Sequence, residues 1–474
     1  MKIYIVPVAT ALLAISQQSG AIPPPPPPTA AQLPVKDTLA FEITEGLTTE
    51  VGPRQAGTEA EQRARDWAVN KLKSLGFANV REEKFDMPTW VRGEEKAWVV
   101  SPFPTPMAIT ALGNSASTGD KPLEGEIVYF PTYDALVDAP AQMVAGKIVF
   151  IDHQMKAAQD GSGYGYFGRA RFTGPNVAAK KGAKAIIIRS IGTDNHRNPH
   201  TGNTNFEAGV APIPSGAISN PDADNLVRQV KRAWAIPLPG SQSELGYRPT
   251  PVIVRLLLTP NNLGQQKSGN IIAEVPGSNA SLPPVVIACH LDSWDLGTGA
   301  IDDASGCGII TAAASYLKKG PPPKRTVRLL WAGAEEVGIW GGKAYGEAYK
   351  AQPHALAMES DFGADRVWRV DFKLPESAKP LEDKIAAALA PLGITRGKDP
   401  ATGGADVGAI IAAQGLAIVD LQQDGTRYFD LHHTPDDTLD KVDPEQMRQN
   451  VIAWTTVLEN VANYEGELAL GVKP

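Results

Sequence analysis

The sequence predicts an α/β fold in which helices cover both faces of a mixed, mostly parallel sheet. Continuous apolar strands alternate with helical segments over the C-terminal half, and a second α/β stretch precedes them in the chain. In addition, 43% of the 474 residues are hydrophobic, which is enough for a large buried core. A chain of this length is expected to fold as two or three domains.

The first 34 residues are expected to lie outside this fold. A basic residue and a short apolar stretch precede Ser19 and Ala21, whose small side chains suit cleavage by a signal peptidase. We therefore predict a signal peptide over residues 1–21 and a secreted or periplasmic protein, with an uncleaved membrane anchor as the alternative. Residues 23–28 are six consecutive prolines, which form an extended spacer within a Pro-rich linker over residues 22–34.

Residues 35–112 are predicted to form the N-terminal part of the main domain. Apolar and small residues recur at helical spacing between residues 58 and 75. Thr58 can cap the start of this helix, and Gly76 can end it. Strands are expected over residues 79–85 and 98–101.

A change of composition marks residues 113–251 as a separate α/β insert. Short apolar runs typical of strands lie at residues 126–130, 147–151 and 185–189. A glycine-rich stretch precedes a helix of small residues, which is expected over residues 175–181. We therefore predict an inserted domain between the two parts of the main domain.

Residues 252–474 are predicted to complete the main domain. Helices are expected over residues 305–318 and 380–392. Ligands of open α/β sheets bind at the carboxyl ends of the strands, so polar residues that follow strands are candidates for a site. The strands are expected at residues 252–258, 270–275, 285–289, 326–331 and 417–420.

Charge and cysteine content exclude several classes of protein. The net charge is −7 and no dense Lys/Arg run occurs, which argues against binding to nucleic acid or to an anionic membrane surface. Cys289 and Cys307 are the only two cysteines, so no disulfide framework can hold the fold together. We expect both to be free buried thiols, with a single bridge between them as the alternative.

Polar residues follow the apolar segments of the main domain as an ordered set. Taken singly, an Asp pair often caps a helix, and a Glu pair often lies exposed in a first helical turn. Taken together, two imidazoles and three carboxylates satisfy a two-zinc site in which one carboxylate bridges the metals, and a spare glutamate remains as a general base. The candidates from which these side chains are drawn are His290, Asp292, Asp302, Asp303, Glu335, Glu336, Glu359, Asp361, His432 and His433.

These segments resemble the M28 metallopeptidases, a family of zinc-dependent exopeptidases. Within that family, the sequence is most similar to the carboxypeptidase Q branch. The resemblance implies the zinc exopeptidase fold, which is phosphorylase/hydrolase-like, with an insert similar to a protease-associated domain, and it implies a homodimer. The motifs that carry it are His290-Leu291-Asp292-Ser293, Asp302-Asp303-Ala304-Ser305-Gly306, Glu335-Glu336, Met358-Glu359-Ser360-Asp361, Tyr428-Phe429-Asp430-Leu431-His432-His433 and Thr434-Pro435-Asp436-Asp437-Thr438.

The resemblance also implies a ligand set for two zinc ions per chain. In one plausible partition, His290 and Asp361 bind the first ion, and Glu336 and His433 bind the second. Asp302 bridges the two ions, because the bridging residue in the family is the first of the acidic pair.

Three further assignments follow from the same resemblance. His433 is preferred to His432 as a ligand because the family's ligand directly precedes a Thr or Ser. Glu335 is implied as the general base, and Asp292 as the partner that orients the imidazole of His290.

The resemblance indicates substrate contacts less directly. Asp406 matches a family loop near the substrate pocket, and a structural turn carboxylate is the alternative. Tyr428 resembles a pocket residue, although an aromatic side chain is often part of a core. His200 belongs to residues 190–206 of the insert, a loop that the resemblance places over the active site.

The sequence therefore predicts an exported di-zinc exopeptidase that hydrolyses short peptides, plausibly dipeptides. One alternative is a one-zinc transferase on the same fold, similar to glutaminyl cyclases. The other is a catalytically silent receptor or scaffold protein. A serine hydrolase is disfavoured because no Gly-x-Ser-x-Gly motif occurs.

Overall fold

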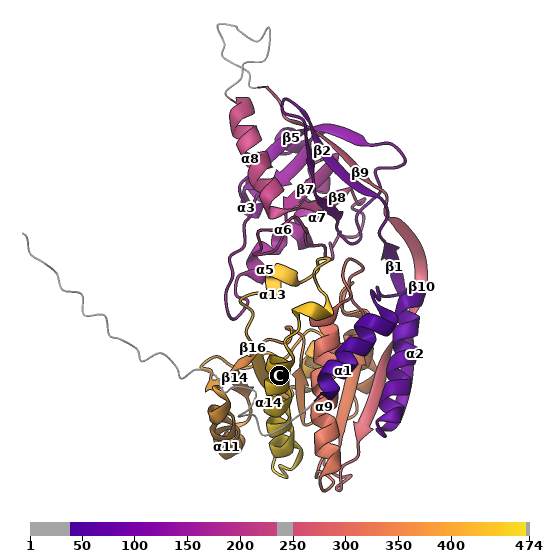
Figure 1. Cartoon of the computed structure of the whole chain (residues 1–474), viewed down its shortest axis with the longest axis vertical. Helices are drawn as coiled ribbons and strands as arrows, with labels where there is room; N and C mark the ends of the chain where they lie inside the picture. Colours follow the sequence, from indigo (N-terminus) through magenta and orange to yellow (C-terminus); the bar gives the residue numbers. More distant parts are fainter. Residues whose placement is uncertain (1–37, 235–249, 471–474) are drawn as a thin grey trace, which may run out of the picture.

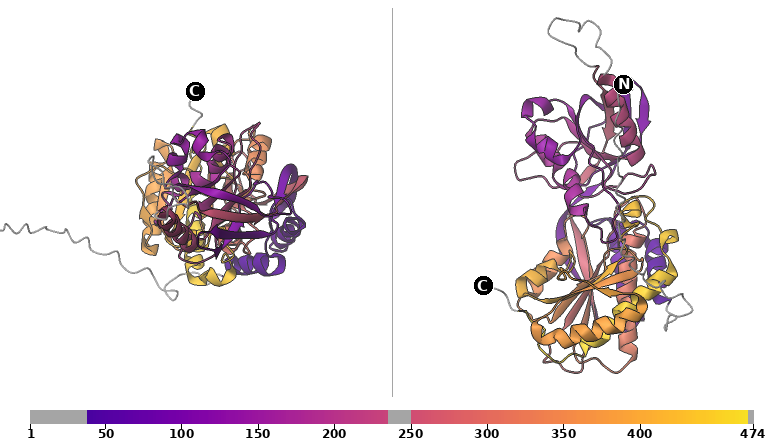
Figure 2. Two further views of the ribbon diagram at one scale, coloured as in Figure 1. Left: turned by 90° about the horizontal axis from the view of Figure 1, so that it is seen from above. Right: turned by 90° about the vertical axis from the view of Figure 1, so that its left-hand side faces the viewer.

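The computed structural model describes residues 38–234 and 250–470. The predicted signal peptide and the linker over residues 22–34 lie outside the described residues. The described chain contains two sheets, which lie one above the other along the long axis of the molecule (Figures 1 and 2). In Figure 1 the lower part holds the C-terminal half of the chain, and the upper part holds the strands found between residues 95 and 258.

The lower part is built on an eight-stranded mixed sheet in the order β1-β10-β12-β11-β13-β16-β14-β15. At its centre β12, β11, β13 and β16 run parallel, whereas β1, β10 and β14 pair with their inner neighbours in antiparallel fashion. The predicted mixed, mostly parallel sheet is confirmed. Its strands are β1 (Ala78–Val91), β10 (Asn261–Val275), β11 (Val285–His290), β12 (Val327–Ala332), β13 (Leu356–Glu359), β14 (Val367–Lys373), β15 (Thr395–Arg396) and β16 (Ala417–Gln423).

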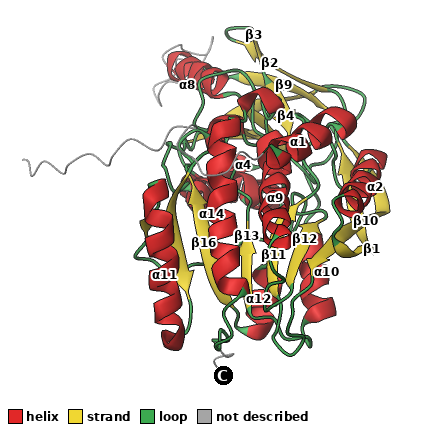
Figure 3. Cartoon of the chain, turned by 60° about the horizontal axis from the view of Figure 1, so that its bottom comes forward, coloured by secondary structure: helices red, strands yellow, loops and turns green. Residues whose placement is uncertain are grey.

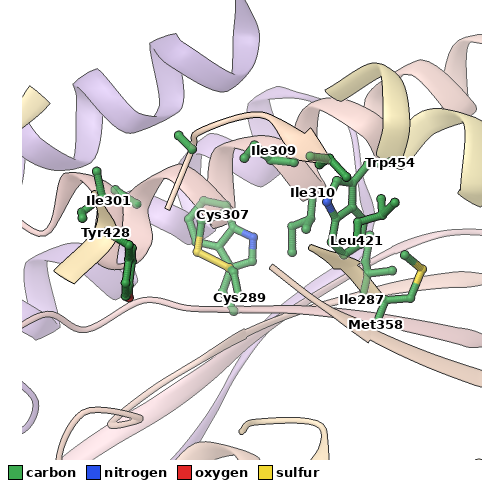
Figure 4. Close-up of a cluster of buried hydrophobic side chains, with 14 of the residues drawn as sticks. Ile287, Cys289, Ile301, Cys307, Ile309, Ile310, Met358, Leu421, Tyr428 and Trp454 are labelled. Carbon is green, nitrogen blue, oxygen red and sulfur yellow. A yellow bond between two sulfur atoms is a disulfide. The ribbon is translucent and has the colours of Figure 1, made fainter. Parts of the chain in front are cut away.

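Helices cover both faces of this sheet. Figure 3 shows α9, α11 and α14 side by side over one face, while α10 and α12 pack on the other. Ile287 of β11 packs among Ile309 and Trp454 on the first face (Figure 4), whereas its neighbour Val286 joins the core beneath Tyr345. The helices are α1 (Leu39–Gly46), α2 (Glu59–Ser74), α9 (Ser305–Lys319), α10 (Trp340–Tyr349), α11 (Lys379–Leu389), α12 (Gly408–Gln414), α13 (Tyr428–Leu431) and α14 (Pro444–Ala462).

Helix α2 confirms the helix expected between residues 58 and 75. The Thr58 side chain accepts a hydrogen bond from the backbone N–H of Glu61, and the Glu61 carboxylate accepts one from the N–H of Gly57. These bonds satisfy free donors at the start of the helix. Ala64 and Leu72 lie on its buried face.

The upper part is a second eight-stranded sheet in the order β3-β2-β9-β5-β6-β7-β8-β4, in which β5, β6, β7 and β8 run parallel. A long antiparallel ribbon of β1 and β10 rises toward it from the lower sheet (Figure 1). The strands are β2 (Glu95–Ser101), β3 (Thr105–Met107), β4 (Ile109–Ala111), β5 (Leu123–Phe130), β6 (Ile148–Ile151), β7 (Ala185–Arg189), β8 (Ser215–Ile218) and β9 (Ile253–Leu258). The helices are α3 (Tyr133–Asp138), α4 (Ala141–Val144), α5 (Tyr164–Phe167), α6 (Arg169–Phe172), α7 (Gly174–Lys180) and α8 (Asn220–Trp234).

The strand expected at residues 252–258 lies in this upper sheet rather than in the main sheet. It forms β9 between β2 and β5 and is antiparallel to both. Val254 and Leu256 are buried while Arg255 between them is exposed, an alternation typical of a strand with one solvent-facing side. Since β2, β3 and β4 also belong to the upper sheet, it extends beyond residues 113–251 at both ends.

The expectation of free thiols is wrong, because Cys289 and Cys307 form a disulfide (Figure 4). Cys289 lies in β11, and Cys307 lies in α9, which packs directly on that strand. This packing brings the two Cα atoms to 5.1 Å, within the range that a disulfide requires. Among the residues that the structure describes, no helix is both long enough and apolar enough to cross a membrane.

Candidate metal centre

The candidate ligands meet at one edge of the lower sheet. The parallel strands β11, β12 and β13 end there and lead into His290, Glu336 and Asp361, respectively. Asp302 lies in the turn before α9, and His433 follows α13. Parallel strands end on the same side of a sheet, so residues far apart in the sequence come together here.

Asp302 lies at the centre of two groups of side chains. Its Oδ1 is 2.9 Å from Nε2 of His290, and its Oδ2 is 3.3 Å from Nε2 of His433. Asp361 Oδ1 lies 3.4 Å from Nε2 of His290, and Glu336 Oε2 lies 2.8 Å from Nε2 of His433. Each imidazole therefore faces one oxygen of Asp302 and one further carboxylate.

Backbone carbonyls determine which nitrogen of each imidazole is free. His290 Nδ1 lies 3.0 Å from the carbonyl oxygen of Asp292, and His433 Nδ1 lies 3.2 Å from that of Thr201. A carbonyl can only accept, so each Nδ1 carries the proton and each Nε2 keeps its lone pair. Both free nitrogens thus face Asp302, which is the arrangement that metal ligation requires.

The carboxylates of this cluster are buried close together, and no Lys or Arg of the described residues forms an ion pair with Asp302, Glu336 or Asp361. Glu336 is buried, and its Oε1 has no hydrogen-bond donor among the described residues. Burial raises the pKa of Glu336 well above its ordinary value, and the nearby Asp302 raises it further. A divalent cation would favour the charged form of these carboxylates, and a set of imidazole and carboxylate donors suits zinc. The residues present therefore fit a metal.

The sequence neighbours Asp303 and His432 have different surroundings from Asp302 and His433. Asp303 accepts hydrogen bonds from the backbone N–H groups of His290 and Gly306, so its carboxylate joins β11 to α9. His432 stacks on His433, and its Nε2 lies 3.7 Å from Asp302, so these three side chains could also hold a cation. Unlike His433, His432 forms no ion pair with a second carboxylate of the described residues.

Glu335 lies beside the cluster without joining it. No described residue forms an ion pair with its carboxylate, while its backbone N–H donates to Oδ1 of Asp292 at 3.0 Å. The same Asp292 oxygen lies 3.7 Å from Nδ1 of His290, so this carboxylate connects the backbone of Glu335 to the imidazole. Burial and the charges of Asp361 and Glu336 raise the pKa of Glu335 well above its ordinary value.

A cavity of about 470 Å³ opens onto the candidate ligands, and both parts of the molecule form its walls. The lower part contributes the acidic cluster, and the upper part contributes a roof. Residues of the lower part that line it are Asp302, Glu335, Glu336, Gly338, Ile339, Lys343, Asp361, Phe362, Tyr428, Phe429, His432 and His433. Residues of the upper part that line it are Tyr164, Arg171, Phe172, Asn203 and Asn205.

The loop of residues 190–206 packs directly against the segment that carries His433. The Thr201 backbone bonds to His433 twice, through its N–H and through its carbonyl oxygen. Tyr164 of α5 stacks on Phe429 of α13 at 4.7 Å, and Figure 1 shows these two helices next to each other. The upper part thereby fixes the orientation of one candidate ligand.

The three expected substrate contacts lie in different places. Tyr428 lines the cavity. His200 pairs with Asp194 at 2.8 Å, and its ring lies 6.2 Å from that of His432, away from the cavity wall. Asp406 is fully buried behind the wall, and neither carboxylate oxygen has a hydrogen-bond donor among the described residues.

Sequence reasoning missed the roof of the cavity. Arg171 and Tyr164 carry no motif, and they come close to His433 only through the packing of the two parts. The Gly-rich stretch at residues 161–168 contains α5 in the structure, and its sequence did not indicate which side chains face the site.

The chain is similar to known peptidases over most of its length. A profile of Peptidase family M28 matches residues 270–458. The chain is 33% identical to carboxypeptidase Q from Bos taurus over 90% of this chain and 86% of the relative, and 31% identical to carboxypeptidase Q from Homo sapiens over the same shares.

Solved structures show the same relationship. The crystal structure of a peptidase M28 precursor from Shewanella amazonensis matches with a TM-score of 0.86 and 43% identity, covering 92% of this chain and 95% of that one. A zinc aminopeptidase from Bacillus subtilis has the same fold, with a TM-score of 0.63 and 20% identity over 93% of this chain and 100% of that one. The chain therefore belongs to peptidase family M28.

Proposed function

We propose that this chain is a metallo-exopeptidase that binds two zinc ions and hydrolyses short peptides. The observation that carries the proposal is the position of Asp302, whose two oxygens face two different imidazoles. Each imidazole has its own second carboxylate, Asp361 beside His290 and Glu336 beside His433. This arrangement offers two adjacent places for a cation, with Asp302 shared between them.

In the proposed mechanism, the metal ions and the side chains of this chain have separate roles. When bound, the ions would supply Lewis acidity and a water of lowered pKa. Glu335 is not among the proposed ligands. Its carboxylate takes a proton from the attacking water and returns that proton to the leaving amine. Asp292 holds the backbone of Glu335 and the ring of His290 in place.

The roof supports a preference for short peptides, plausibly dipeptides. Tyr164 and Arg171 of the upper part line the cavity opposite the acidic cluster, and we expect them to limit the length of peptide that can lie across it. We propose that the upper part is an insert similar to a protease-associated domain. The dimer that the resemblance implies stays a prediction.

Metal content and dipeptide hydrolysis test this proposal together. We expect the zinc-loaded protein to hold close to two zinc ions per chain and to cleave unblocked dipeptides. Removal of the metal with a chelator should abolish cleavage, and added zinc should restore it, because the ligands are already positioned. Elemental analysis of the same samples used for the peptide assay measures both quantities.

Two other results would favour the alternative functions. One zinc per chain together with cyclisation of N-terminal glutamine would indicate a transferase instead. Full zinc occupancy without hydrolysis of any short peptide would indicate a silent scaffold.

We also propose that the protein is exported. The signal-peptide pattern of residues 1–21 supports export, and so does the disulfide between Cys289 and Cys307, since disulfides persist in oxidising compartments. N-terminal sequencing of the protein recovered outside the cytoplasm should begin at Ile22. Recovery of the full-length chain only from the cytoplasm would contradict export.

A further inference from the structure

The two cysteines of the chain form a disulfide beside the candidate metal ligands (Figure 4). Cys289 directly precedes His290 at the end of β11. Cys307 lies in the first turn of α9, shortly after Asp302. The bridge therefore closes a ring of the chain over residues 289–307. His290 and Asp302, two of the three proposed ligands of the first zinc ion, belong to this ring.

Asp303 adds a second link within the same ring. Its carboxylate accepts hydrogen bonds from the backbone N–H groups of His290 at 3.2 Å and of Gly306 at 3.0 Å. The Sγ of Cys307 lies 3.2 Å from the carbonyl oxygen of His290. The backbone of His290 is thus held against the start of α9 by one covalent bridge and by one carboxylate.

The bridge restrains the distance between the two elements that carry these ligands. It holds the Cα atoms of Cys289 and Cys307 at 5.1 Å, whereas two free thiols would impose no such distance. Pairing with β12 and β13 already fixes β11 within the sheet. The bridge therefore acts mainly on α9 and on the preceding turn, which places Oδ1 of Asp302 2.9 Å from Nε2 of His290.

We infer that the disulfide between Cys289 and Cys307 positions His290 and Asp302 for the first zinc ion, so that tight binding of this ion requires oxidation of the two cysteines. This inference rests on the proposed two-zinc function and adds a redox condition to it. Groups that orient metal ligands typically raise metal affinity by about 10- to 100-fold, and we expect the disulfide to act within this range.

The second ion should depend less on the bridge. Two of its three proposed ligands, Glu336 and His433, lie outside the ring. In contrast, the general stabilisation that a disulfide provides acts chiefly on the unfolded chain, so it does not change the zinc affinity of the folded protein. Selective weakening of one ion therefore distinguishes positioning of the ligands from general stabilisation of the fold.

This redox condition is consistent with the proposed export. Thiols stay reduced in the cytoplasm and are oxidised in the compartments that exported proteins enter. In the exchange, the two thiols give their hydrogens to an external disulfide, which becomes two thiols, and a bond forms between the sulfurs of Cys289 and Cys307. Both cysteines are fully buried, so the exchange requires that α9 is not yet packed on β11. The chain thus acquires its tightly bound first ion at its destination.

Thermodynamic linkage gives the inference a second, independent consequence. If the disulfide raises the affinity for zinc by some factor, saturating zinc must favour the disulfide over the two thiols by the same factor. The opposite sign is expected if the thiols bind zinc themselves. Both sulfurs and a carboxylate oxygen of Asp303 lie within 4.8 Å of one another, and thiolates are strong zinc ligands. The sign of the linkage therefore separates the two cases.

Zinc titrations of the oxidised and the reduced chain measure the first consequence. The reduced chain is prepared by unfolding in urea and refolding with a phosphine reductant. We expect it to bind one of its two ions about 10- to 100-fold more weakly than the oxidised chain does. Dipeptide hydrolysis should fall at limiting zinc and recover at saturating zinc.

Variants assign this difference to the cysteines. The double variant Cys289→Ala, Cys307→Ala should bind zinc like the reduced wild type and should not respond to the reductant. Leu72→Ala is the control for general stability, because Leu72 is fully buried in α2 and belongs neither to the ring nor to the cavity. It should unfold more easily in urea but keep the zinc affinities of the wild type.

Redox titration of the unsubstituted chain measures the second consequence. The chain is equilibrated in glutathione buffers, with free zinc either absent or held at a fixed saturating concentration. Alkylation of free thiols followed by mass spectrometry gives the oxidised fraction. Zinc should shift the equilibrium toward the disulfide by the same factor that the zinc titrations give.

The contrary results have distinct meanings. Equal zinc affinities of the oxidised and the reduced chain would overturn the inference. A shift toward the thiols on addition of zinc would also overturn it and would place an ion between the sulfurs and Asp303. Equal weakening of both ions, seen in Leu72→Ala as well, would reduce the bridge to general stabilisation. An oxidised wild type that binds only one ion, or that cleaves no short peptide, is instead a failure of the proposed function.

Discussion

Glu335→Gln is expected to lower kcat by about 100- to 10,000-fold, which is the range for removal of a general base. Glutamine keeps the size of the side chain but cannot take up a proton. The backbone N–H of residue 335 would still donate to Asp292, so the loop should keep its conformation. Steady-state kinetics on an unblocked dipeptide, with the zinc content of the same sample, measure the effect.

The zinc content distinguishes a base from a ligand. Glu335→Gln should keep the zinc content of the wild type, whereas Glu336→Gln should lose zinc, because Glu336 faces Nε2 of His433. Glu347→Gln, an exposed site on the same helix as Lys343, is the matched control and should behave as the wild type. Wild-type turnover in the Glu335→Gln protein would contradict the role of the base.

The candidate ligands could be predicted from the sequence because local rules govern them. His290, Glu336 and Asp361 each follow a buried strand, and neighbouring parallel strands end at the same edge. The order of these residues in the chain, together with the additional Glu335, then indicates metal-dependent hydrolysis with a general base. The sequence pattern therefore indicated which residues meet, although not the carbonyls that orient the imidazoles.

The upper wall of the cavity and the disulfide depend on packing between segments that are distant in the sequence. No local sequence pattern predicts such packing. Arg171 reaches the site because Thr201 accepts its hydrogen bond and also bonds to His433. The disulfide forms because α9 packs on β11, so the separation of 18 positions between the two cysteines does not predict it. Likewise, the sequence of β9 alternates buried residues with the exposed Arg255, a pattern that is compatible with either sheet. The pairing of β9 with β2 and β5 shows that it belongs to the upper sheet.

Arg54→Met is expected to lower the free energy of unfolding by roughly 2–6 kcal/mol, since it leaves the carbonyl oxygens of Leu291 and Thr298 without a donor, at about 1–3 kcal/mol each. Arg54 is fully buried and donates to the carbonyl oxygens of Leu291, Thr298 and Gly299 at 2.5, 2.6 and 2.9 Å. Methionine fills the volume but supplies no donor. Thermal and urea unfolding of the metal-free protein measure the loss.

The position of these bonds links stability to metal binding. The three carbonyls lie in the loop between His290 and Asp302, so a loosened loop would change the distance between two proposed metal ligands. We therefore expect Arg54→Met to weaken zinc binding as well, and Arg54→Lys to recover little, because an ammonium group cannot span three acceptors. Arg63→Met, an exposed site on α2, is the control. An Arg54→Met protein with wild-type stability and zinc affinity would show that the loop holds its shape without this guanidinium.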